Sequence, residues 1–171
     1  MDNSLGRDES VLIADDEINI ILLIKSLIDR KKTAVEIIGE AGDGITALEM
    51  VRRLKPDVVI TDIRMPGMSG MDLIRHVREE QIPVEFVIIS GYSEFEYARS
   101  AIQYGVSDYL LKPIKKDELN DVLAKLESQR ASRREQQMQF NLMEDRLASN
   151  NGILRKNLLQ NLLTGDGELF R

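Results

Sequence analysis

Short apolar runs alternate with amphipathic segments along most of the chain. Turn residues bound each run, which is typical of strands that alternate with helices in a parallel sheet. Three of the runs are nearly all apolar, as expected of central strands covered by helices on both faces. The five runs are Val11–Ala14, Val35–Ile38, Val58–Thr61, Phe86–Ile89 and Asp108–Leu111. The pattern predicts an α/β fold with a doubly wound, five-stranded parallel sheet and a binding crevice beyond the carboxyl ends of its strands.

Apolar residues at helical spacing lie between these runs and predict the helices that cover the sheet. In the first such segment the predicted buried stripe consists of Ile20, Leu23, Ile24, Leu27 and Ile28. The predicted helices cover about 17–30, 45–54, 70–80 and 94–104, and another begins near Lys115.

From about Ser128 the chain becomes a polar helical extension with sparse apolar positions. Phe140, Met143, Leu147 and Leu154 are spaced three, four and seven residues apart, as in a broken heptad series. A solvated helix and a dimeric coiled coil both fit, and Gly152 is a candidate interruption. The polar seam positions that weaken a coiled coil are Gln129, Arg133, Gln136 and Asn150. A denser cluster then follows at Leu158, Leu159, Leu162 and Leu163, and we expect it to need a partner that the chain does not contain.

Composition limits the chemistry that the chain can perform. The 171 residues are 43% hydrophobic and 30% charged and include no cysteine and one histidine. Disulfides, cysteine-bound zinc and a His-rich metal site are therefore excluded, so that any metal must be held by oxygen atoms. The polar, acidic start MDNSLGRDES does not resemble a secretory signal, and no apolar stretch is long enough to span a membrane. We expect a cytoplasmic protein.

The net charge of −6 is unevenly distributed. Residues 128–171 carry seven Lys/Arg and five Asp/Glu, which leaves −8 on residues 1–127. An acidic domain is a poor surface for nucleic acid, because contacts to phosphates supply most non-specific binding. If the protein acts on DNA, another module should make the contact.

Polar residues stand at the ends of the predicted strands. Because parallel strands point their carboxyl ends the same way, these residues should meet in one crevice. They are Asp15 and Asp16 after the first run, Asp62 after the third, Ser90 after the fourth and Lys112 after the fifth. Clustered carboxylates repel one another unless a cation lies between them, and Mg²⁺ suits oxygen ligands best. Asp62 is then a candidate nucleophile toward a phosphoryl group, with Lys112 and Ser90 contacting the transferred oxygens.

Each of these residues also has a simpler reading when taken alone. Asp15 and Asp16 could cap the first helix, Asp62 could open a turn, and Lys112 could be a loop lysine. Their occurrence together, at the ends of successive predicted strands, favours the functional reading. Gly42-Asp43-Gly44 is predicted to be a strand-to-helix turn rather than a phosphate loop, and His76 is predicted to be exposed.

The motifs Leu-Ile-Ala-Asp-Asp-Glu at 12–17, Asp62-Ile-Arg-Met-Pro-Gly, Ser90-Gly and Tyr109-Leu-Leu-Lys-Pro resemble the receiver domain of bacterial two-component response regulators. The resemblance implies the flavodoxin-like strand order 2-1-3-4-5 and phosphorylation of Asp62 by a sensor histidine kinase. It also implies that Asp16 and the backbone carbonyl of Arg64 bind Mg²⁺ directly, that Asp15 acts through water, and that Asp62 belongs to the same metal site.

The same resemblance makes Ser90 and Tyr109 a switch pair and implies a cis bond before Pro113. The switch would alter a face formed by the fourth helix, the fifth strand and the fifth helix. That face would include Tyr97, Ala101, Tyr104 and Lys115. No enzymatic turnover of external substrates is expected, only self-phosphorylation from a phosphodonor and slow self-dephosphorylation, which Arg64 and Tyr92 would tune.

The resemblance also suggests how the chain is divided. Residues 1–9 would be a flexible tail, 10–127 the receiver domain, 128–163 a helical linker, and 164–171 the start of an output region that this chain lacks. The stretches Gly91–Tyr97 and Tyr104–Tyr109 most resemble receivers joined to an AraC-type helix-turn-helix module. The expected output is therefore transcription control through DNA, and a homodimer would form through the switch face or the helical extension.

Two other function classes compete with this one. Phosphatases of the haloacid dehalogenase type also use an Asp nucleophile at a strand end. Their motif is D-x-D-x-T, in which the second Asp is the acid/base residue, and the corresponding position 64 here is Arg. The acid/base residue is therefore absent. A stand-alone interaction module, in which the helical extension docks on a partner, is the other alternative.

Overall fold

The computed structural model describes residues 7–91 and 95–164, and for residues 95, 98 and 161–164 it describes only the backbone. The backbone divides into two compact units, residues 1–129 and residues 130–171. Each unit is treated by itself below.

The first unit contains a five-stranded sheet in the order β2-β1-β3-β4-β5. All four strand pairings are parallel, so the predicted fold class and strand order are confirmed. The strands are β1 (Glu9–Ala14), β2 (Val35–Ala41), β3 (Val58–Asp62), β4 (Glu85–Ser90) and β5 (Asp108–Leu111). Most are longer than the apolar runs that predicted them, because backbone pairing such as Glu9 with Val35 leaves no mark in side-chain polarity.

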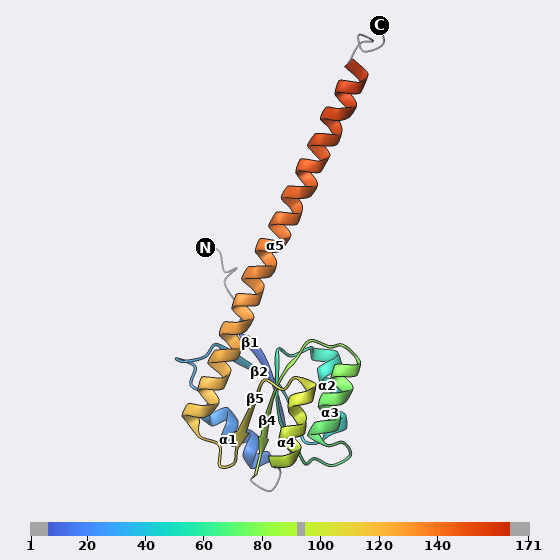
Figure 1. Ribbon diagram of the computed structural model, residues 1–171. Helices are drawn as coiled ribbons and strands as arrows, with labels where there is room; N and C mark the ends of the chain where they lie inside the picture. The colour runs from blue at the N-terminus through green and yellow to red at the C-terminus, as the bar shows by residue number, and fades with distance from the viewer. Residues whose placement is uncertain (1–6, 92–94, 165–171) are drawn as a thin grey trace. The chain divides into compact units, whose positions relative to one another are not determined.

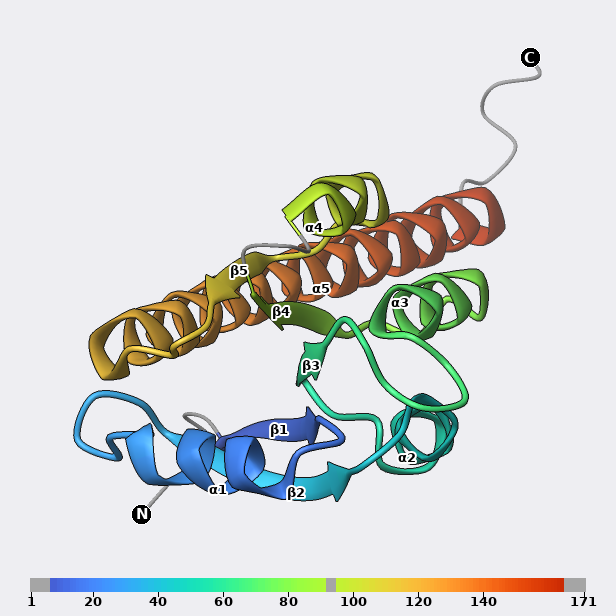
Figure 2. The same ribbon diagram turned by 90° about the horizontal axis from the view of Figure 1, so that it is seen from below.

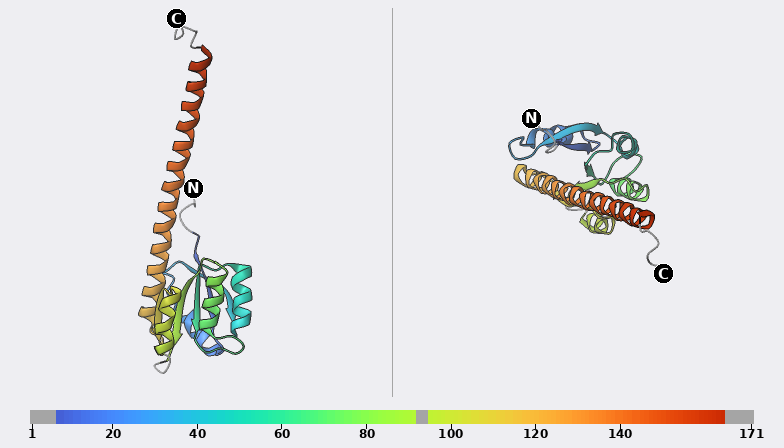
Figure 3. Two further views of the ribbon diagram at one scale, coloured as in Figure 1. Left: turned by 45° about the vertical axis from the view of Figure 1, so that its right-hand side comes forward. Right: turned by 90° about the horizontal axis from the view of Figure 1, so that it is seen from above.

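Helices cover both faces of this sheet (Figures 1 and 2). They are α1 (Ile18–Leu27), α2 (Gly44–Leu54), α3 (Gly70–Glu79), α4 (Phe95–Ala101), the 3₁₀ turn η2 (Ile102–Tyr104) and α5 (Lys116–Thr164). Helices α2, α3 and α4 lie on one face, and α1 and the first part of α5 lie on the other; Figure 3 shows these layers from two further sides.

The alternation of side chains along each strand produces two separate cores. In β1, Leu12 faces the cluster that α2 and α3 complete with Ala47 and Leu73. Its neighbour Ile13 faces the opposite cluster, which includes Ile24 of α1 and Leu123 of α5. Both faces of the sheet are therefore buried beneath helices, as the nearly all-apolar central strands predicted.

Three sequence-based expectations about the helices need correction. Helix α1 buries Ile21 and Ile24, whereas Leu23, placed in the predicted stripe, is 38% exposed. Because nearly every residue of this segment is apolar, periodicity could not select the buried face. The segment predicted as one helix over 94–104 becomes 3₁₀ from Ile102 and is ended by Gly105, whose φ is 69°. His76, predicted to be exposed, is partly buried.

The end of α1 is fixed by one buried side chain of α5. Asn120, 1% exposed, accepts a hydrogen bond from the backbone N–H of Asp29 at 2.8 Å. Its amide nitrogen donates to the carbonyl oxygens of Leu27 and Lys116 at 2.8 and 2.7 Å. Asn120 therefore satisfies backbone groups that the end of a helix leaves without partners, and it joins α1 to α5.

The side chain of Arg78 connects α3 to the end of η2 and to the start of β4. Its guanidinium donates to the carbonyl oxygens of Tyr104, Val84 and Gly105 at 2.9, 2.8 and 3.1 Å. It also lies 5.3 Å from the centre of the Phe86 ring. One side chain thus holds the end of η2 against α3 and the start of β4.

The Gly42-Asp43-Gly44 segment is a strand-to-helix turn, as predicted. Asp43 caps α2 by accepting hydrogen bonds from the N–H and hydroxyl of Thr46 at 2.7 and 2.8 Å. Gly44 is required there, because a Cβ atom would lie 2.1 Å from the carbonyl oxygen of Met68. The side chain of Asp43 therefore serves as the N-cap of α2.

In the second unit α5 continues as a single helix through Gly152, which does not interrupt it. Its described side chains over 130–160 are exposed, apart from the partly buried Arg130. Within the described residues, no helix combines the length and the apolar character needed to cross a membrane.

Candidate functional site

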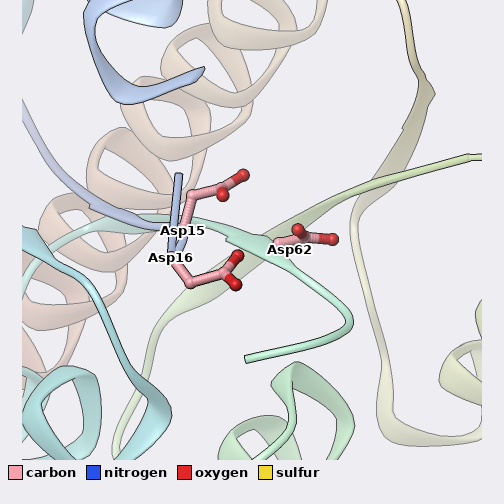
Figure 4. Close-up of side chains that lie close together, drawn as sticks. All are labelled: Asp15, Asp16 and Asp62. Carbon is pink, nitrogen blue, oxygen red and sulfur yellow. The ribbon is translucent and has the colours of Figure 1, made fainter. Parts of the chain in front are cut away.

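Three carboxylates converge at the carboxyl edge of the sheet. Asp15 and Asp16 follow β1, and Asp62 is the last residue of β3. One oxygen atom from each lies within 4.8 Å of the others, and Figure 4 shows the three side chains close together at the ends of the two strands. Asp15 and Asp62 are buried, whereas Asp16 is exposed. The convergence expected from strand direction alone is therefore present.

Asp15 is only partly satisfied by the protein around it. Its Oδ1 accepts a hydrogen bond from the N–H of Glu17 at 2.9 Å. Its Oδ2 is buried without a hydrogen bond, since Lys112 Nζ is 3.9 Å away. Burial, followed by the charges of Asp62 and Asp16, raises the pKa of Asp15 to about 6. A buried carboxylate oxygen without a partner is costly, and a bound cation would remove that cost.

Asp62 is held on both oxygens. Its Oδ1 accepts from the N–H of Ile63 at 2.7 Å, and its Oδ2 accepts from Lys112 Nζ at 3.2 Å. Burial opposes the charge on Lys112, but Asp62, and more weakly Asp15 and Glu17, outweigh it and raise the pKa of Lys112. The ammonium group therefore stays charged beside the carboxylate of Asp62.

The turn after Asp62 depends on close backbone approach, which the sequence reasoning did not identify. The N–H of Gly70 donates to the carbonyl oxygen of Ile63 at 2.7 Å. A Cβ atom at Gly70 would lie 2.0 Å from the carbonyl oxygen of Asp62. The buried hydroxyl of Thr61 donates to that same oxygen at 2.9 Å. Gly70 opens a predicted helix and Thr61 lies in a predicted strand, so neither carried a separate signal.

Ser90 lies at the end of β4, next to β3, and is fully buried. Its hydroxyl shares a hydrogen bond with the hydroxyl of Tyr109 on β5 and also donates to the carbonyl oxygen of Gly91 at 3.2 Å. The N–H of Lys112 donates to the carbonyl oxygen of Ser90 at 2.8 Å, and the Lys112–Pro113 bond is cis, as expected. A Cβ atom at Gly91 would meet no heavy atom within 4 Å, so there is space beside Ser90.

Other predicted site residues are less fully placed. Arg64 lies in the turn after Asp62 with an exposed side chain, and metal binding by its carbonyl stays a prediction. Tyr92 lies outside the described residues. On the predicted switch face, Tyr97 is 55% exposed and Tyr104 is 36% exposed. Ala101 is buried in the core, so its assignment to that surface was wrong.

Tyr109 connects the site to a surface groove. The groove lies between η2 and β5, and its lining includes Ile88, Ile102, Val106 and Tyr109. Because the hydroxyl of Tyr109 is bonded to Ser90, the same ring contacts both the interior and this groove. The arrangement as a whole could hold a divalent cation on two or three carboxylates and stabilise added negative charge at Asp62 through Lys112.

Comparison with known proteins gives one consistent result. A family model described as "Response regulator receiver domain" matches residues 11–124. The uncharacterized transcriptional regulatory protein YesN of Bacillus subtilis is 39% identical over 123 residues, which cover 70% of this chain and 33% of YesN. The transcriptional regulatory protein HptR of Staphylococcus aureus is 38% identical over 116 residues, 68% of this chain and 45% of HptR.

A solved structure agrees with the sequence relatives. The REC domain of AraT, a response regulator from Geobacillus stearothermophilus, superposes with a TM-score of 0.71 at 39% identity. The match covers 75% of this chain and 99% of that domain. The chain thus corresponds to a whole solved domain but spans only about a third to a half of the length of its curated relatives.

Proposed function

The chain belongs to the response regulator receiver domain family, and from that premise we propose that Asp62 is the residue that accepts a phosphoryl group from a sensor histidine kinase. The family consists of response regulators rather than turnover enzymes. One observation carries the assignment to Asp62: its carboxylate is the member of the acidic cluster that accepts a hydrogen bond from Lys112, at 3.2 Å.

Receiver domains bind Mg²⁺ in an acidic pocket, and the residues here fit that ion. The buried Oδ2 of Asp15 lacks a hydrogen bond. One carboxylate oxygen from each of Asp15, Asp16 and Asp62 lies within 4.8 Å of the others. We propose that these three carboxylates and the carbonyl of Arg64 form the site. When bound, Mg²⁺ would neutralise charge on the transferred phosphoryl oxygens.

The side chains of the site divide the remaining work. A carboxylate oxygen of Asp62 forms the new P–O bond as the bond between phosphorus and its donor breaks. The N–H of Ile63 holds the orientation of the carboxylate, and Lys112 stabilises the charge that arrives. Slow hydrolysis of the product, tuned by Arg64 and Tyr92, belongs to the same proposal.

We propose that Ser90 and Tyr109 transmit this event. A phosphoryl group on Asp62 offers new acceptor oxygens to the hydroxyl of Ser90, which now bonds to Tyr109. A change in that hydrogen bond would alter the position of the Tyr109 ring and therefore the shape of the groove that the ring lines. Charge at a buried site would thereby be converted into a change of the α4–β5–α5 surface.

The output is proposed from the relatives, which are named as transcriptional regulators. A DNA-binding domain outside this chain, of the AraC type, would make the DNA contact, since residues 1–127 carry a net charge of −8. Homodimerisation, through the α4–β5–α5 face or the helical extension, would couple phosphorylation of Asp62 to the contact with DNA.

The assignment of Asp62 is tested by measuring the intact mass after incubation with a small-molecule phosphodonor and Mg²⁺. The wild-type protein should gain one phosphoryl group, and Asp62→Asn should gain none. Asp72→Asn is the matched control, because that carboxylate is 50% exposed on α3 and outside the cluster. An adduct that persists in Asp62→Asn, or fails to form in the wild type, would overturn the proposal.

A further inference from the structure

The second unit presents apolar side chains that nothing in its described part covers. Phe140, Met143, Leu147, Leu154 and Leu158 are each 56 to 66% exposed. A single helix in water gains little from backbone hydrogen bonds alone, and most helical stability in proteins comes from packing of an apolar face. This helix therefore needs a packing partner.

The spacing of these residues specifies the kind of partner. Phe140, Leu147 and Leu154 are seven residues apart, and Met143 is three residues after Phe140. In heptad terms the first three occupy a positions and Met143 a d position, so they form one seam on the helix. Gln129, Arg133 and Gln136 occupy the same seam further upstream. The apolar part of the seam therefore begins at Phe140.

We propose that this seam, residues 140–158, pairs with the same seam of a second copy of this chain in a parallel, in-register coiled coil. A heptad seam buries its side chains only against another helix with matching repeats, and a second copy supplies that repeat in register. The polar residues Asn150 and Asn157 occupy the remaining d positions, where each would meet its own counterpart. Such polar seam residues weaken a coiled coil but fix its register.

The residues that flank the seam agree with a parallel pair. In that arrangement each g position faces the e position five residues later on the other helix. Gln139 then faces Glu144, and Arg146 faces Asn151, so that no like charges meet. Ile153 faces Leu158, which widens the apolar contact. Gly152 falls at an f position, pointing away from the partner, where the absence of a side chain costs no contact.

Of the two dimer surfaces proposed above, this coiled coil uses the helical extension, and its formation does not depend on the phosphoryl chemistry. Its failure would leave the Asp62 adduct unchanged, and failure of the adduct would leave the coiled coil unchanged. The two proposals can therefore be separated with one set of purified variants.

The first test measures molar mass by light scattering over a dilution series of the unphosphorylated chain. The wild type should have the mass of two chains at high concentration. Leu147→Asp/Leu154→Asp should raise the dissociation constant at least tenfold. Met138→Asp/Leu142→Asp is the matched control, because these equally exposed residues occupy f and c positions outside the seam. Single-chain mass for the wild type throughout, or equal loss in the control, would overturn the proposal.

A second test does not depend on disrupting the helix. The chain contains no cysteine, so one introduced cysteine reports one contact. Leu147→Cys and Leu154→Cys should each form a disulfide-linked dimer under mild oxidation, because in a parallel pair both residues meet their own counterparts at bridging distance. Leu142→Cys should not. Cross-linking at only one of the two seam positions, or equally at position 142, would contradict the parallel pairing.

Discussion

Two carboxylates at opposite edges of the sheet, Asp57 and Asp15, are in opposite states. At the amino edge, Asp57 precedes β3 and is fully engaged: its Oδ2 accepts from the N–H and hydroxyl of Ser10, both at 2.9 Å, and its Oδ1 accepts from Arg7 at 3.0 Å. At the carboxyl edge, Asp15 keeps a buried oxygen without a hydrogen bond. The protein can fully satisfy a strand-end carboxylate, and the buried Oδ2 of Asp15 is an exception that a bound cation would explain.

Gly70→Ala should lower the free energy of unfolding most, because it acts on the backbone that shapes the carboxyl edge of the sheet. The new Cβ would lie 2.0 Å from the carbonyl oxygen of Asp62, so the turn must move. We expect a loss of about 3 kcal/mol or more in the free energy of unfolding, measured by urea denaturation. Gly42→Ala is the control, since a Cβ there meets nothing within 4 Å. Equal midpoints for the two variants would refute this account.

The unsatisfied state of Asp15 predicts a pH dependence in metal-free buffer. Its pKa in the folded protein is about 6, above the ordinary value of 3.8, so the folded state binds the proton more tightly than the unfolded state. Stability contributed by the protonated form is complete below pH 4 and is lost as the pH rises through 6. The loss should approach about 3 kcal/mol.

Urea denaturation between pH 4 and pH 7, with a chelator present, measures that loss. Asp15→Asn should flatten the curve, and added Mg²⁺ should restore stability to the wild type at pH 7. A wild-type curve as flat as that of Asp15→Asn would show that the buried oxygen carries no such cost.

Asp57, whose carboxylate is fully hydrogen-bonded, should respond differently to substitution and to Mg²⁺. Asp57→Ala removes the acceptor of the Ser10 N–H and hydroxyl, and we expect a loss of about 2 kcal/mol in the free energy of unfolding. Added Mg²⁺ should not restore it. Asp72→Ala, which removes an exposed carboxylate, should cost much less. Rescue of Asp57→Ala by Mg²⁺ would remove the distinction between the two edges.

Arg78→Lys should have the smallest effect of the four. A lysine can reach one of the three carbonyl oxygens that the guanidinium now contacts, so we expect a loss of about 1 to 2 kcal/mol. Arg75→Lys on the same helix, where the side chain contacts only Asp72 among the bonds described, is the control. Thermal unfolding midpoints would compare them, and indistinguishable values would show that the three contacts contribute nothing.

The sequence was sufficient for features that repeat along it or lie at strand ends. Five apolar runs determined the sheet, and strand direction alone brought Asp15, Asp62 and Lys112 together. Features that depend on contact between distant segments left no local signal. Arg78 looks like any charged residue at the end of a helix, and Asp57 looks like a turn residue. Their partners, Gly105 and Ser10, are identified only once the chain has folded.

The buried side chain of Asn120 has a consequence for the order in which the chain becomes structured. The backbone groups that it binds at the end of α1 lie 91 and 93 residues earlier in the sequence. During synthesis from the amino terminus, α1 leaves the ribosome long before α5 exists, so its last turn stays open to water until Asn120 arrives. The hydrogen bonds that close the end of α1 can therefore form only after the segment that leads into the helical extension has been made. A nascent chain released before residue 120 would lack the contact that closes its first helix.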